Sequence, residues 1–447
     1  MLIEGPYVNQ QPNPRTSSAA ATLLPGALDL DSACAYIQAH AKPIAQWRHG
    51  LEYELIGFDR DTNERIDPAT VQQLLQAMCT RGGIPHVEEA NIISVRLPYG
   101  ELTLEPGGQI EFSGFPERTI ADVKNEMRRF LADLHEQAEA LGAYFIGLGF
   151  DPLRSLEEQH WIAKRRYRIM RPYLRQRGGY GWDMMTRTAA IQVSLDYSDL
   201  GDLGRKYVLG NRLAPIVAAM FANSPFAGGV TTGLLSTRYA VWLDTDPDRT
   251  GPGPLSLSDQ FDVRDLAAAL LDVPVFYVIR SGELVACAGL RLTDIEDARV
   301  EDFRDLLSMV FTEARVREYV EMRSADSGSP QMALALLALW KGLTYDSCAL
   351  TQALEVAPHL DQAAYRSLQM AVARHGLRAH CEGVDVLRIA RDVVALAREG
   401  LGRIAPPEVA HLDMLAQHVA DGVTPADLLL AISKGDVYRA MQAAIVA

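Results

Sequence analysis

The segment from Glu101 to Gly114 constrains the fold more strongly than any other part of this chain. Apolar and polar side chains alternate on both sides of the turn at residues 106–108, Pro-Gly-Gly, which is the pattern of two short extended segments. One face of this pair carries only polar side chains, those of Glu101, Thr103, Glu105, Gln109, Glu111 and Ser113. Such a face is either the solvated side of a half-buried sheet or a site that requires cations.

The same alternation recurs in three further segments and puts two polar residues on one face of each. These pairs are Glu52 with Glu54, Gln192 with Ser194, and Glu321 with Arg323. If these faces belong to one sheet, five carboxylates share a single concavity: Glu52, Glu54, Glu105, Glu111 and Glu321. Like charges at such distances either raise one another's pKa or require metal ions.

The composition of this face indicates which metal it would bind. Oxygen ligands together with an amide fit Mg²⁺ or Mn²⁺ rather than zinc. Hard cations that keep open coordination positions most often bridge nucleotide phosphates, so the predicted chemistry is ATP-dependent. The chain has no Walker A sequence and no Rossmann fingerprint, and neither absence excludes ATP.

The charge balance argues against a nucleic-acid-binding function. The 447-residue chain carries a formal net charge of −14, whereas nucleic-acid binding requires a concentrated basic surface. The one basic cluster, residues 164–168, is either a solvated helix end or an anion pocket. We therefore expect small-molecule partners and no nucleic acid.

The cysteines and the apolar segments indicate a cytoplasmic protein. The five cysteines are scattered, without a C-x-x-C pair or the spacing of a zinc site, which predicts reduced thiols. The first residues lack the basic and apolar regions of a signal peptide. The longest apolar run, residues 332–340, is far shorter than the roughly 20 residues that span a bilayer. We expect no membrane association, and the sequence does not specify the oligomeric state.

The order of the predicted elements indicates an α+β fold. Residues 1–30 are rich in Pro, Gln, Asn, Ser and Ala and predict a poorly ordered leader, and residues 31–447 predict a single domain. Helices are predicted from about residue 31 and over 70–80, 119–141 and 204–223, and strands over 47–58, 91–113, 144–150, 189–197 and 238–243. The predicted sheet core spans about 47–300, and the part from about 301 to 447 is mostly helical. Because there is no βαβ rhythm, an antiparallel or mixed sheet with a polar concave face, backed by helices, is favoured.

The segment 104–114, Leu-Glu-Pro-Gly-Gly-Gln-Ile-Glu-Phe-Ser-Gly, closely resembles a signature of the glutamate–cysteine ligase family of the plant and proteobacterial type. The similarity covers most of the chain from about residue 40, through the segments 47–58, 166–171, 183–188, 223–226, 244–251, 272–274 and 321–326. The resemblance implies a glutamine-synthetase-like catalytic sheet, with ATP as co-substrate and two or three magnesium ions. It also implies that the γ-carboxylate of glutamate is joined to the amine of cysteine, in the first step of glutathione biosynthesis.

The resemblance further implies a role for each residue that matches a family motif. The predicted magnesium shell, which agrees with the face pattern above, is Glu52, Glu54, Glu105, Glu111, Gln192 and Glu321. Arg166 and Arg238 match positions that hold the substrate glutamate, where a guanidinium can bind a carboxylate bidentately. Arg323, together with Glu321, is predicted to be catalytic, because it matches a position that faces the transferred phosphoryl group. The implied mechanism is formation of γ-glutamyl phosphate from ATP, followed by attack of the acceptor amine.

Several positions depart from the plant pattern and concern the acceptor amine. Tyr53 replaces a histidine, Leu55 a lysine and Ser194 an asparagine, while Ala189 and Ala190 replace a more polar pair. None of these substitutions removes a predicted magnesium ligand, but they alter the shape beside a substrate site. An alternative is therefore a γ-glutamyl ligase that acts on another small amino acid or amine in a specialised biosynthetic pathway. The cysteines also do not match the regulatory disulfides of the plant enzymes.

Two hypotheses of other classes compete with the ligase. A catalytically silent regulator that kept the fold would bind metal or nucleotide without turnover, but the complete carboxylate set favours the enzyme. A nucleic-acid binder built on residues 164–168 conflicts with the acidic net charge, and it would require a steep salt dependence.

Overall fold

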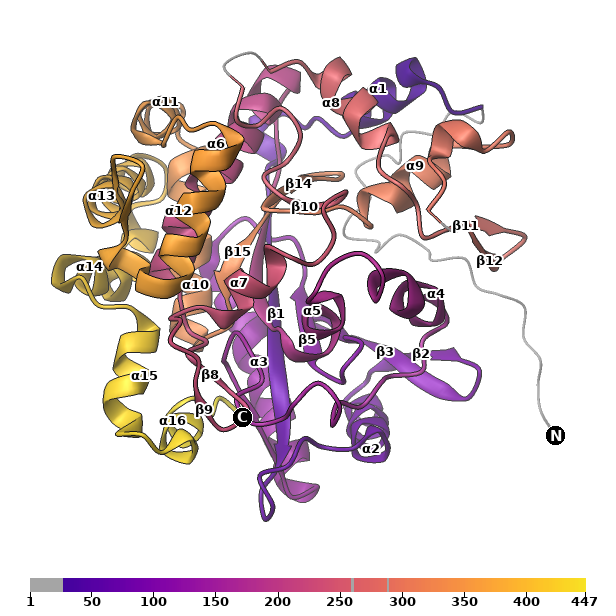
Figure 1. Ribbon diagram of the computed structural model, residues 1–447, viewed down its shortest axis with the longest axis vertical. Helices are drawn as coiled ribbons and strands as arrows, with labels where there is room; N and C mark the ends of the chain where they lie inside the picture. Colours follow the sequence, from indigo (N-terminus) through magenta and orange to yellow (C-terminus); the bar gives the residue numbers. More distant parts are fainter. Residues whose placement is uncertain (1–26, 259–260, 288) are drawn as a thin grey trace.

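The computed structural model describes residues 27–258, 261–287 and 289–447. Among these residues the largest element is a nine-stranded antiparallel sheet in the order β14-β15-β7-β1-β5-β4-β3-β2, with β6 paired to the far end of β1. Its strands are β1 (His49–Asp59), β2 (Ile84–Glu88), β3 (Asn91–Leu97), β4 (Gly100–Leu104), β5 (Ile110–Gly114), β6 (Ala143–Ile146), β7 (Ala190–Leu195), β14 (Ala314–Val316) and β15 (Val320–Asp326). Figure 1 shows β1 crossing the middle of the molecule.

Helices surround this sheet and make up most of the C-terminal third. They are α1 (Leu30–Ala39), α2 (Pro68–Cys79), α3 (Ile120–Ala140), α4 (Arg165–Leu174), α5 (Gly181–Arg187), α6 (Leu200–Met220), α7 (Thr237–Trp242), α8 (Val263–Leu271), α9 (Val300–Leu307), α10 (Pro330–Thr344), α11 (Ser347–Val356), α12 (Gln362–His375), α13 (Val386–Ile404), α14 (Asp413–Asp421), α15 (Pro425–Ser433) and α16 (Val437–Ala443). The described residues also form four short two-stranded sheets: β8 (Phe226–Ala227) with β9 (Val230–Thr231), β10 (Thr250–Gly251) with β13 (Phe311–Thr312), β11 (Tyr277–Arg280) with β12 (Glu283–Ala286), and β16 (His380–Cys381) with β17 (Val384–Asp385). The predicted α+β fold, an antiparallel sheet backed by helices, is confirmed.

The two faces of the sheet differ in chemistry because side chains alternate along each strand. On one face Leu51, Tyr53 and Leu55 of β1 are buried, and helices α2, α3, α6 and α10 pack against this side. Phe112 of β5 stacks on Phe130 of α3 with ring centroids 4.4 Å apart. The other face carries the polar side chains predicted from the sequence.

Most predicted helices begin close to their expected positions because polar caps precede them. Asp67 accepts a hydrogen bond from the Thr70 N–H, and Pro68 occupies the first helical position of α2. Thr119 caps α3 and Asp199 caps α6 in the same manner. Such caps satisfy backbone N–H groups that have no partner inside the helix.

The strand predicted over 238–243 is wrong, because these residues belong to helix α7. Ser236 caps this helix: its hydroxyl accepts a hydrogen bond from the Tyr239 N–H at 3.0 Å and donates one to Asp326 at 2.8 Å. The apparent alternation of polar and apolar residues in this short segment therefore does not reflect a strand. The strand predicted over 144–150 is also shorter, since β6 ends at Ile146.

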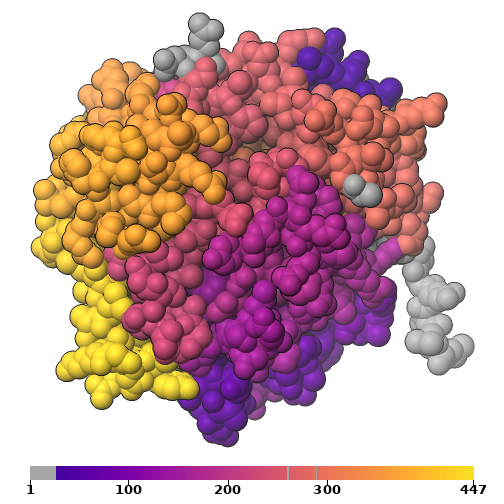
Figure 2. Space-filling model, in the orientation of Figure 1, coloured from indigo at the N-terminus to yellow at the C-terminus, as the bar shows by residue number. Residues whose placement is uncertain are grey.

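The sheet extends beyond the predicted limit near residue 300, because β14 and β15 lie at residues 314–326. From Pro330 onward the chain is mostly helical. Figure 2 shows these C-terminal helices, in orange and yellow, lying directly against the middle part of the chain on this face. The last residues return to the sheet, where the Phe145 N–H donates to the Ala447 carbonyl at 2.6 Å. Of the predicted leader, residues 1–26 lie outside the described residues.

Candidate functional site

The polar faces predicted from the sequence lie side by side in the central sheet. Glu54 of β1 stands directly opposite Glu111 of β5, and Glu52 stands opposite Gln192 of β7. Glu321 of β15 follows on the far side of β7. Residues directly opposite each other in antiparallel strands share one face of the sheet. Strands distant in sequence therefore build one continuous polar surface.

Glu105 joins this surface from the turn between β4 and β5. The Glu105 N–H donates to the Gln109 carbonyl at 2.8 Å, and the Gly108 N–H donates to the Glu105 carbonyl at 3.0 Å. Gly108 has a φ of 82°, a conformation that favours glycine. The charge of Glu105 contributes to the raised pKa of both Glu54 and Glu111, so these three carboxylates lie within electrostatic reach of one another.

Three of the carboxylates titrate far from their ordinary range. Burial raises the pKa of Glu52 to about 8, and the charges of Glu321 and Glu111 add to this shift. Burial likewise raises the pKa of Glu111 to about 7, with Glu105 as the next cause. The pKa of Glu54 is also raised well above its usual value by burial and by the neighbouring carboxylates. Clustered buried carboxylates favour the protonated form unless cations compensate their charge.

Glu321 differs because arginines surround it. Burial opposes its charge, but Arg315 and Arg323 hold its pKa well below the usual range. Its Oε2 lies 2.7 Å from Arg315 and 2.6 Å from Arg323. Its Oε1 is buried and has no hydrogen-bond partner in the structure. A buried, unpartnered carboxylate oxygen costs free energy unless a further ligand satisfies it.

Neighbouring groups orient the remaining carboxylates. Glu54 accepts hydrogen bonds from the Ala190 N–H at 2.8 Å and from the Gln192 amide at 2.9 Å. Glu111 accepts one from the Thr103 hydroxyl at 3.1 Å. The Arg323 guanidinium also donates to the Gln192 side-chain oxygen, so Gln192 bridges a carboxylate and an arginine.

These residues fit the hard cations expected from the sequence. All the donors are oxygen atoms of carboxylates and an amide, which suits Mg²⁺ or Mn²⁺. Repulsion within the set and the unpartnered oxygen of Glu321 both call for positive charge at this surface. Across the described ranges, no group of three or more His, Cys, Asp or Glu side chains is already gathered closely enough to hold a metal ion. The role of these residues as ligands therefore stays a prediction.

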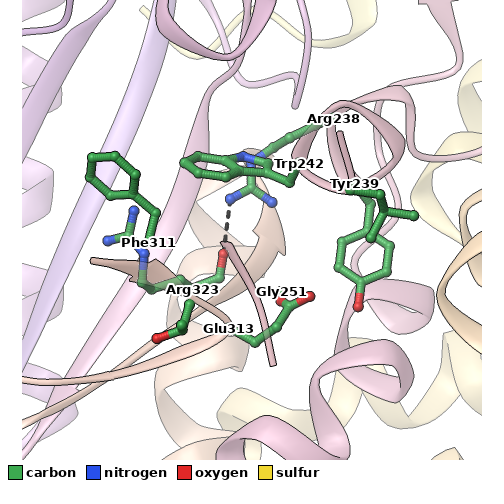
Figure 3. Close-up of a pocket in the computed structure, with 9 residues that line it drawn as sticks. Arg238, Tyr239, Trp242, Gly251, Phe311, Glu313 and Arg323 are labelled. Carbon is green, nitrogen blue, oxygen red and sulfur yellow. Dashed lines mark hydrogen bonds between the residues drawn. The ribbon is translucent and has the colours of Figure 1, made fainter. Parts of the chain in front are cut away.

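Arg238 and Arg323 meet at a pocket on the β15 side of the polar surface. The pocket is lined by Arg238, Tyr239, Trp242, Leu243, Gly251, Phe311, Thr312, Glu313 and Arg323. Figure 3 shows Arg238 beside Trp242, with its guanidinium donating to the Arg323 carbonyl, and the Arg323 side chain extending toward Phe311. That hydrogen bond measures 2.8 Å. The pocket thus combines two cationic side chains with aromatic walls.

A buried carboxylate, Glu313, forms the acidic part of this pocket. It accepts a hydrogen bond from the Gln369 amide at 2.7 Å, and burial raises its pKa. The sequence analysis assigned no role to Glu313. This residue lies outside the strands, so the alternation of polar and apolar residues does not distinguish it. The pocket can therefore contact both a negative and a positive group of a small molecule.

Arg166 lies on the opposite side of β1 from Arg238, close to the hairpin formed by β4 and β5. It belongs to helix α4 and donates to the Tyr167 hydroxyl at 3.0 Å. Tyr167 in turn donates to the Leu104 carbonyl at 3.0 Å. The two arginines assigned to glutamate therefore approach the polar surface from different elements.

Two buried cations that received no individual role from the sequence also contact this hairpin. Lys164 donates to the Leu104 carbonyl at 2.7 Å, and burial lowers its pKa to about 8. Arg65 donates to the Gly107 carbonyl at 2.7 Å and pairs with the buried Asp151 at 3.0 Å. Lys164 was visible only as part of a basic cluster, and Arg65 had no local signal because its partners are distant in sequence.

The prediction for Gln109 is wrong in one respect. Its side chain does not face the polar surface but is buried, and its amide donates to the Thr188 carbonyl at 2.9 Å while accepting from the Gly107 N–H at 3.0 Å. It ties the hairpin to the end of α5. The alternation fails here because Gln109 lies in the turn, before β5 begins at Ile110.

Two of the departures from the plant pattern do not lie at this surface. Tyr53 and Leu55 point to the apolar face of the sheet and are completely buried. The Tyr53 hydroxyl donates to the Gly328 carbonyl at 2.6 Å. Both residues therefore contribute to the core, and the expectation that they alter the acceptor pocket is wrong. Ser194 does lie on the polar face, opposite Glu321.

The sequence matches a known family over most of its length. Residues 48–443 match the model of glutamate–cysteine ligase family 2. The chloroplastic glutamate–cysteine ligase of Brassica juncea is 34% identical over 435 residues, which cover 95% of this chain and 84% of the relative. That of Nicotiana tabacum is 34% identical over 440 residues, covering 96% and 84%.

A solved structure shares the fold. The crystal structure of glutamate–cysteine ligase from Francisella tularensis in complex with AMP superimposes with a TM-score of 0.55. The match covers 89% of this chain and 87% of that chain at 13% sequence identity. At this identity the likeness concerns the fold alone, and it agrees with the antiparallel sheet and surrounding helices described above.

Proposed function

The chain belongs to glutamate–cysteine ligase family 2, and we propose that it joins the γ-carboxylate of glutamate to the amine of cysteine with consumption of ATP. The product, γ-glutamylcysteine, is the first intermediate of glutathione biosynthesis. The observation that carries this proposal is the polar surface shared by adjacent strands, on which Glu54 opposes Glu111 and Glu52 opposes Gln192. A surface of this kind suits the reacting phosphates of ATP once cations compensate its charge.

We assign the cations of this surface to two or three Mg²⁺ ions, with Mn²⁺ as a substitute. The residues that would hold them are Glu52, Glu54, Glu105, Glu111, Gln192 and Glu321. When bound, these ions would neutralise the phosphate oxygens of ATP and polarise the transferred phosphoryl group. Strand backbones hold five of these side chains at β1, β5, β7 and β15, which limits the reorganisation needed during the reaction.

The proposed reaction has two steps. A γ-carboxylate oxygen of glutamate attacks the γ-phosphorus of ATP, so that a new O–P bond forms while the bond to the ADP oxygen breaks. The acceptor amine then attacks the carbonyl carbon of γ-glutamyl phosphate, and the C–O bond to phosphate breaks with loss of an amine proton. Arg323 donates to the oxygens of the transferred phosphoryl group, where charge accumulates. Arg166 and Arg238 hold the carboxylates of glutamate.

In this proposal Arg238, which holds glutamate, also borders the pocket that would take the acceptor. Its aromatic walls, Trp242 and Phe311, suit a small apolar or thiol side chain, and Glu313 offers a partner for a positive group. Cysteine is the proposed acceptor, and another small amino acid is the alternative. Comparing ADP release with cysteine, 2-aminobutyrate, alanine and serine at equal concentration distinguishes them. If cysteine shows no advantage in kcat/KM, the acceptor assignment is wrong.

The metal assignment is tested by replacing Glu111 with Gln. This change keeps the shape of the side chain but removes the charge that faces Glu54, so we expect magnesium-dependent ADP formation to fall by about 100-fold or more. Glu101→Gln is the matched control, because Glu101 lies on the same polar face but bonds to Ser94 at 2.9 Å. Equal activity of the two variants would contradict the assignment. If the unmodified chain itself formed no ADP, the result would instead favour a catalytically silent protein that binds metal or nucleotide without turnover.

We further propose a cytoplasmic location. All five cysteines lie in the described part of the chain, and none of them forms a disulfide there. Unpaired cysteines are typical of proteins in reducing compartments. No described helix combines the length and the apolar character needed to cross a membrane.

A further inference from the structure

We propose that Tyr167 is a positioning residue that aligns the glutamate-binding arginine with the metal-binding hairpin. This inference rests on the function proposed above, and it assigns a role to a side chain that is itself neither a predicted ligand nor a predicted substrate contact. The relevant groups are the Tyr167 hydroxyl, the Arg166 guanidinium and the backbone carbonyl of Leu104.

The Tyr167 hydroxyl connects two parts of the site by two hydrogen bonds. It accepts one from Arg166 at 3.0 Å and donates one to the Leu104 carbonyl at 3.0 Å. Leu104 is the last residue of β4, and Glu105 follows it directly. The arginine assigned to glutamate is therefore separated from a predicted metal ligand only by one hydroxyl and one peptide group.

The burial of Tyr167 makes this link rigid. Its side chain is 3% exposed, whereas Arg166 is exposed to solvent. The Arg166 guanidinium carbon also lies 4.9 Å from the centre of the Tyr167 ring, over its face. A long exposed arginine loses many conformations when it binds a substrate, and a fixed aromatic partner reduces that loss before binding. Tyr167 therefore keeps Arg166 in a limited set of orientations beside the hairpin.

The surrounding contacts imply that removing the hydroxyl leaves the fold intact. Lys164 still donates to the Leu104 carbonyl at 2.7 Å, and the Ile162 N–H still donates to the Pro106 carbonyl at 2.8 Å. The Tyr167 ring would remain in place in a Tyr167→Phe variant. This variant therefore removes the link between Arg166 and the hairpin without leaving the Leu104 carbonyl unpaired.

Tyr173 provides a matched control on the same helix. Its hydroxyl accepts a hydrogen bond from Arg249 at 3.3 Å, so it also pairs with an arginine. It lies near the opposite end of α4, where its ring packs edge-on against Phe276 with centroids 5.1 Å apart. Tyr173→Phe thus removes a comparable hydroxyl at a distance from the polar surface.

The experiment compares the two variants with the unmodified chain in steady-state kinetics and in glutamate binding. For Tyr167→Phe we expect the KM for glutamate to rise by about tenfold, the factor that corresponds to one lost hydrogen bond to a charged group. The KM for the acceptor should change by less than about twofold, since the pocket at Arg238 lies on the opposite side of β1 from Tyr167. Calorimetric titration of glutamate in the presence of Mg²⁺ and ADP should show the same loss of affinity without turnover.

Tyr173→Phe should leave both constants unchanged, and the melting temperatures of the two variants should agree. If the two variants have the same KM for glutamate, or if acceptor and glutamate constants rise together, the inference is wrong. A failure of the proposed function gives a different result. In that case neither the unmodified chain nor the Tyr167→Phe variant forms ADP when glutamate and an acceptor are supplied.

Discussion

At the scale of single residues, Gly107 shows how closely the hairpin approaches helix α5. A Cβ atom at this position would lie 2.3 Å from the Thr186 carbonyl oxygen and 2.7 Å from the Thr186 Cα. Both contacts are with backbone, which cannot move aside as the end of a side chain can. The glycine of this turn therefore permits contact between the hairpin and α5, in addition to the turn itself.

We predict that Gly107→Ala lowers the free energy of unfolding by about 1–3 kcal/mol, the usual cost of forcing an extra group into a packed site. It should also raise the magnesium concentration that is needed for half-maximal activity, because Glu105 and Glu111 lie on the two sides of the turn. Denaturant titration and activity at increasing magnesium measure the two effects.

Gly402→Ala is the control for this substitution. Gly402 lies in helix α13, and beyond its chain neighbours and the nearby backbone of its own helix no atom comes within 4 Å of the added Cβ, so alanine there should raise stability by roughly 0.5–1 kcal/mol. If the two substitutions had the same effect, the close approach at Gly107 would not matter for stability.

Residue by residue, the site was predictable where the polar side chains lie on strands. Glu52, Glu54, Glu111 and Gln192 all share the face that alternation assigns to them. Gln109 was not predictable in this way, because it precedes β5 and does not obey the alternation of that strand.

At the scale of elements, the C-terminal residues complete the sheet at β6. The Val446 N–H donates to the Phe145 carbonyl at 2.9 Å, and the Gly147 N–H donates to the Ala444 carbonyl at 3.0 Å. Together with the bond from Phe145 to Ala447, these contacts cover the free edge of a short strand. An uncovered edge offers unpaired backbone groups to other chains.

We predict that deleting residues 444–447 lowers the free energy of unfolding by about 4 kcal/mol, because the four backbone hydrogen bonds to residues 145–147, of about 1 kcal/mol each, are lost. The shortened protein should also aggregate more readily on heating. Denaturant titration and light scattering measure these changes.

The matched control for the deletion is Ile445→Thr, which keeps the backbone pairing and changes a side chain that is 37% exposed. Its stability should stay within about 0.5 kcal/mol of the unmodified chain, as for most surface substitutions. Equal losses in the two proteins would mean that the side chain, and not the pairing, stabilises this edge.

Element prediction succeeded where caps and periodicity agree, as for α2 and α3, and failed for α7. The six residues of α7 are too few for a helical period to be recognised, so the cap at Ser236 was the only local signal. The hydroxyl of Ser236 is in turn held by Asp326, which lies 90 residues away in sequence.

At the scale of the whole molecule, the clustered carboxylates make stability depend on pH. The pKa values of Glu52 and Glu111 are raised from about 4.5 to about 8 and about 7 by burial and by neighbouring carboxylates. Between the ordinary pKa of about 4.5 and these raised values, the folded state still binds protons that the unfolded state has released. The free energy of unfolding therefore decreases as the pH rises through this interval.

We predict that the melting temperature of the metal-free protein falls by several degrees between about pH 6 and about pH 8, and that magnesium restores it. Magnesium should raise the melting temperature more at the higher pH, because cations bind the ionised carboxylates. Differential scanning calorimetry at both pH values, with and without magnesium, measures this effect.

Glu111→Gln should show a weaker response of the melting temperature to both pH and magnesium, since one of the titrating groups is absent. Glu321 does not reverse the expected direction, because its lowered pKa acts below about pH 4.5. A magnesium effect that is equal at the two pH values would contradict the assignment of these carboxylates to a cation site.

The sequence by itself determined which side chains share a face of each strand, and the resemblance of the segment 104–114 indicated the family and the chemistry. This was possible because alternation along a strand and the match to a motif are local properties of the chain. Only the tertiary structure decided that β7 and β15 follow β1 on one side while β5 follows on the other. It also decided that Tyr53 belongs to the core and that Tyr167 connects Arg166 to the hairpin. These relations depend on contacts between residues far apart in sequence, and no local pattern specifies them.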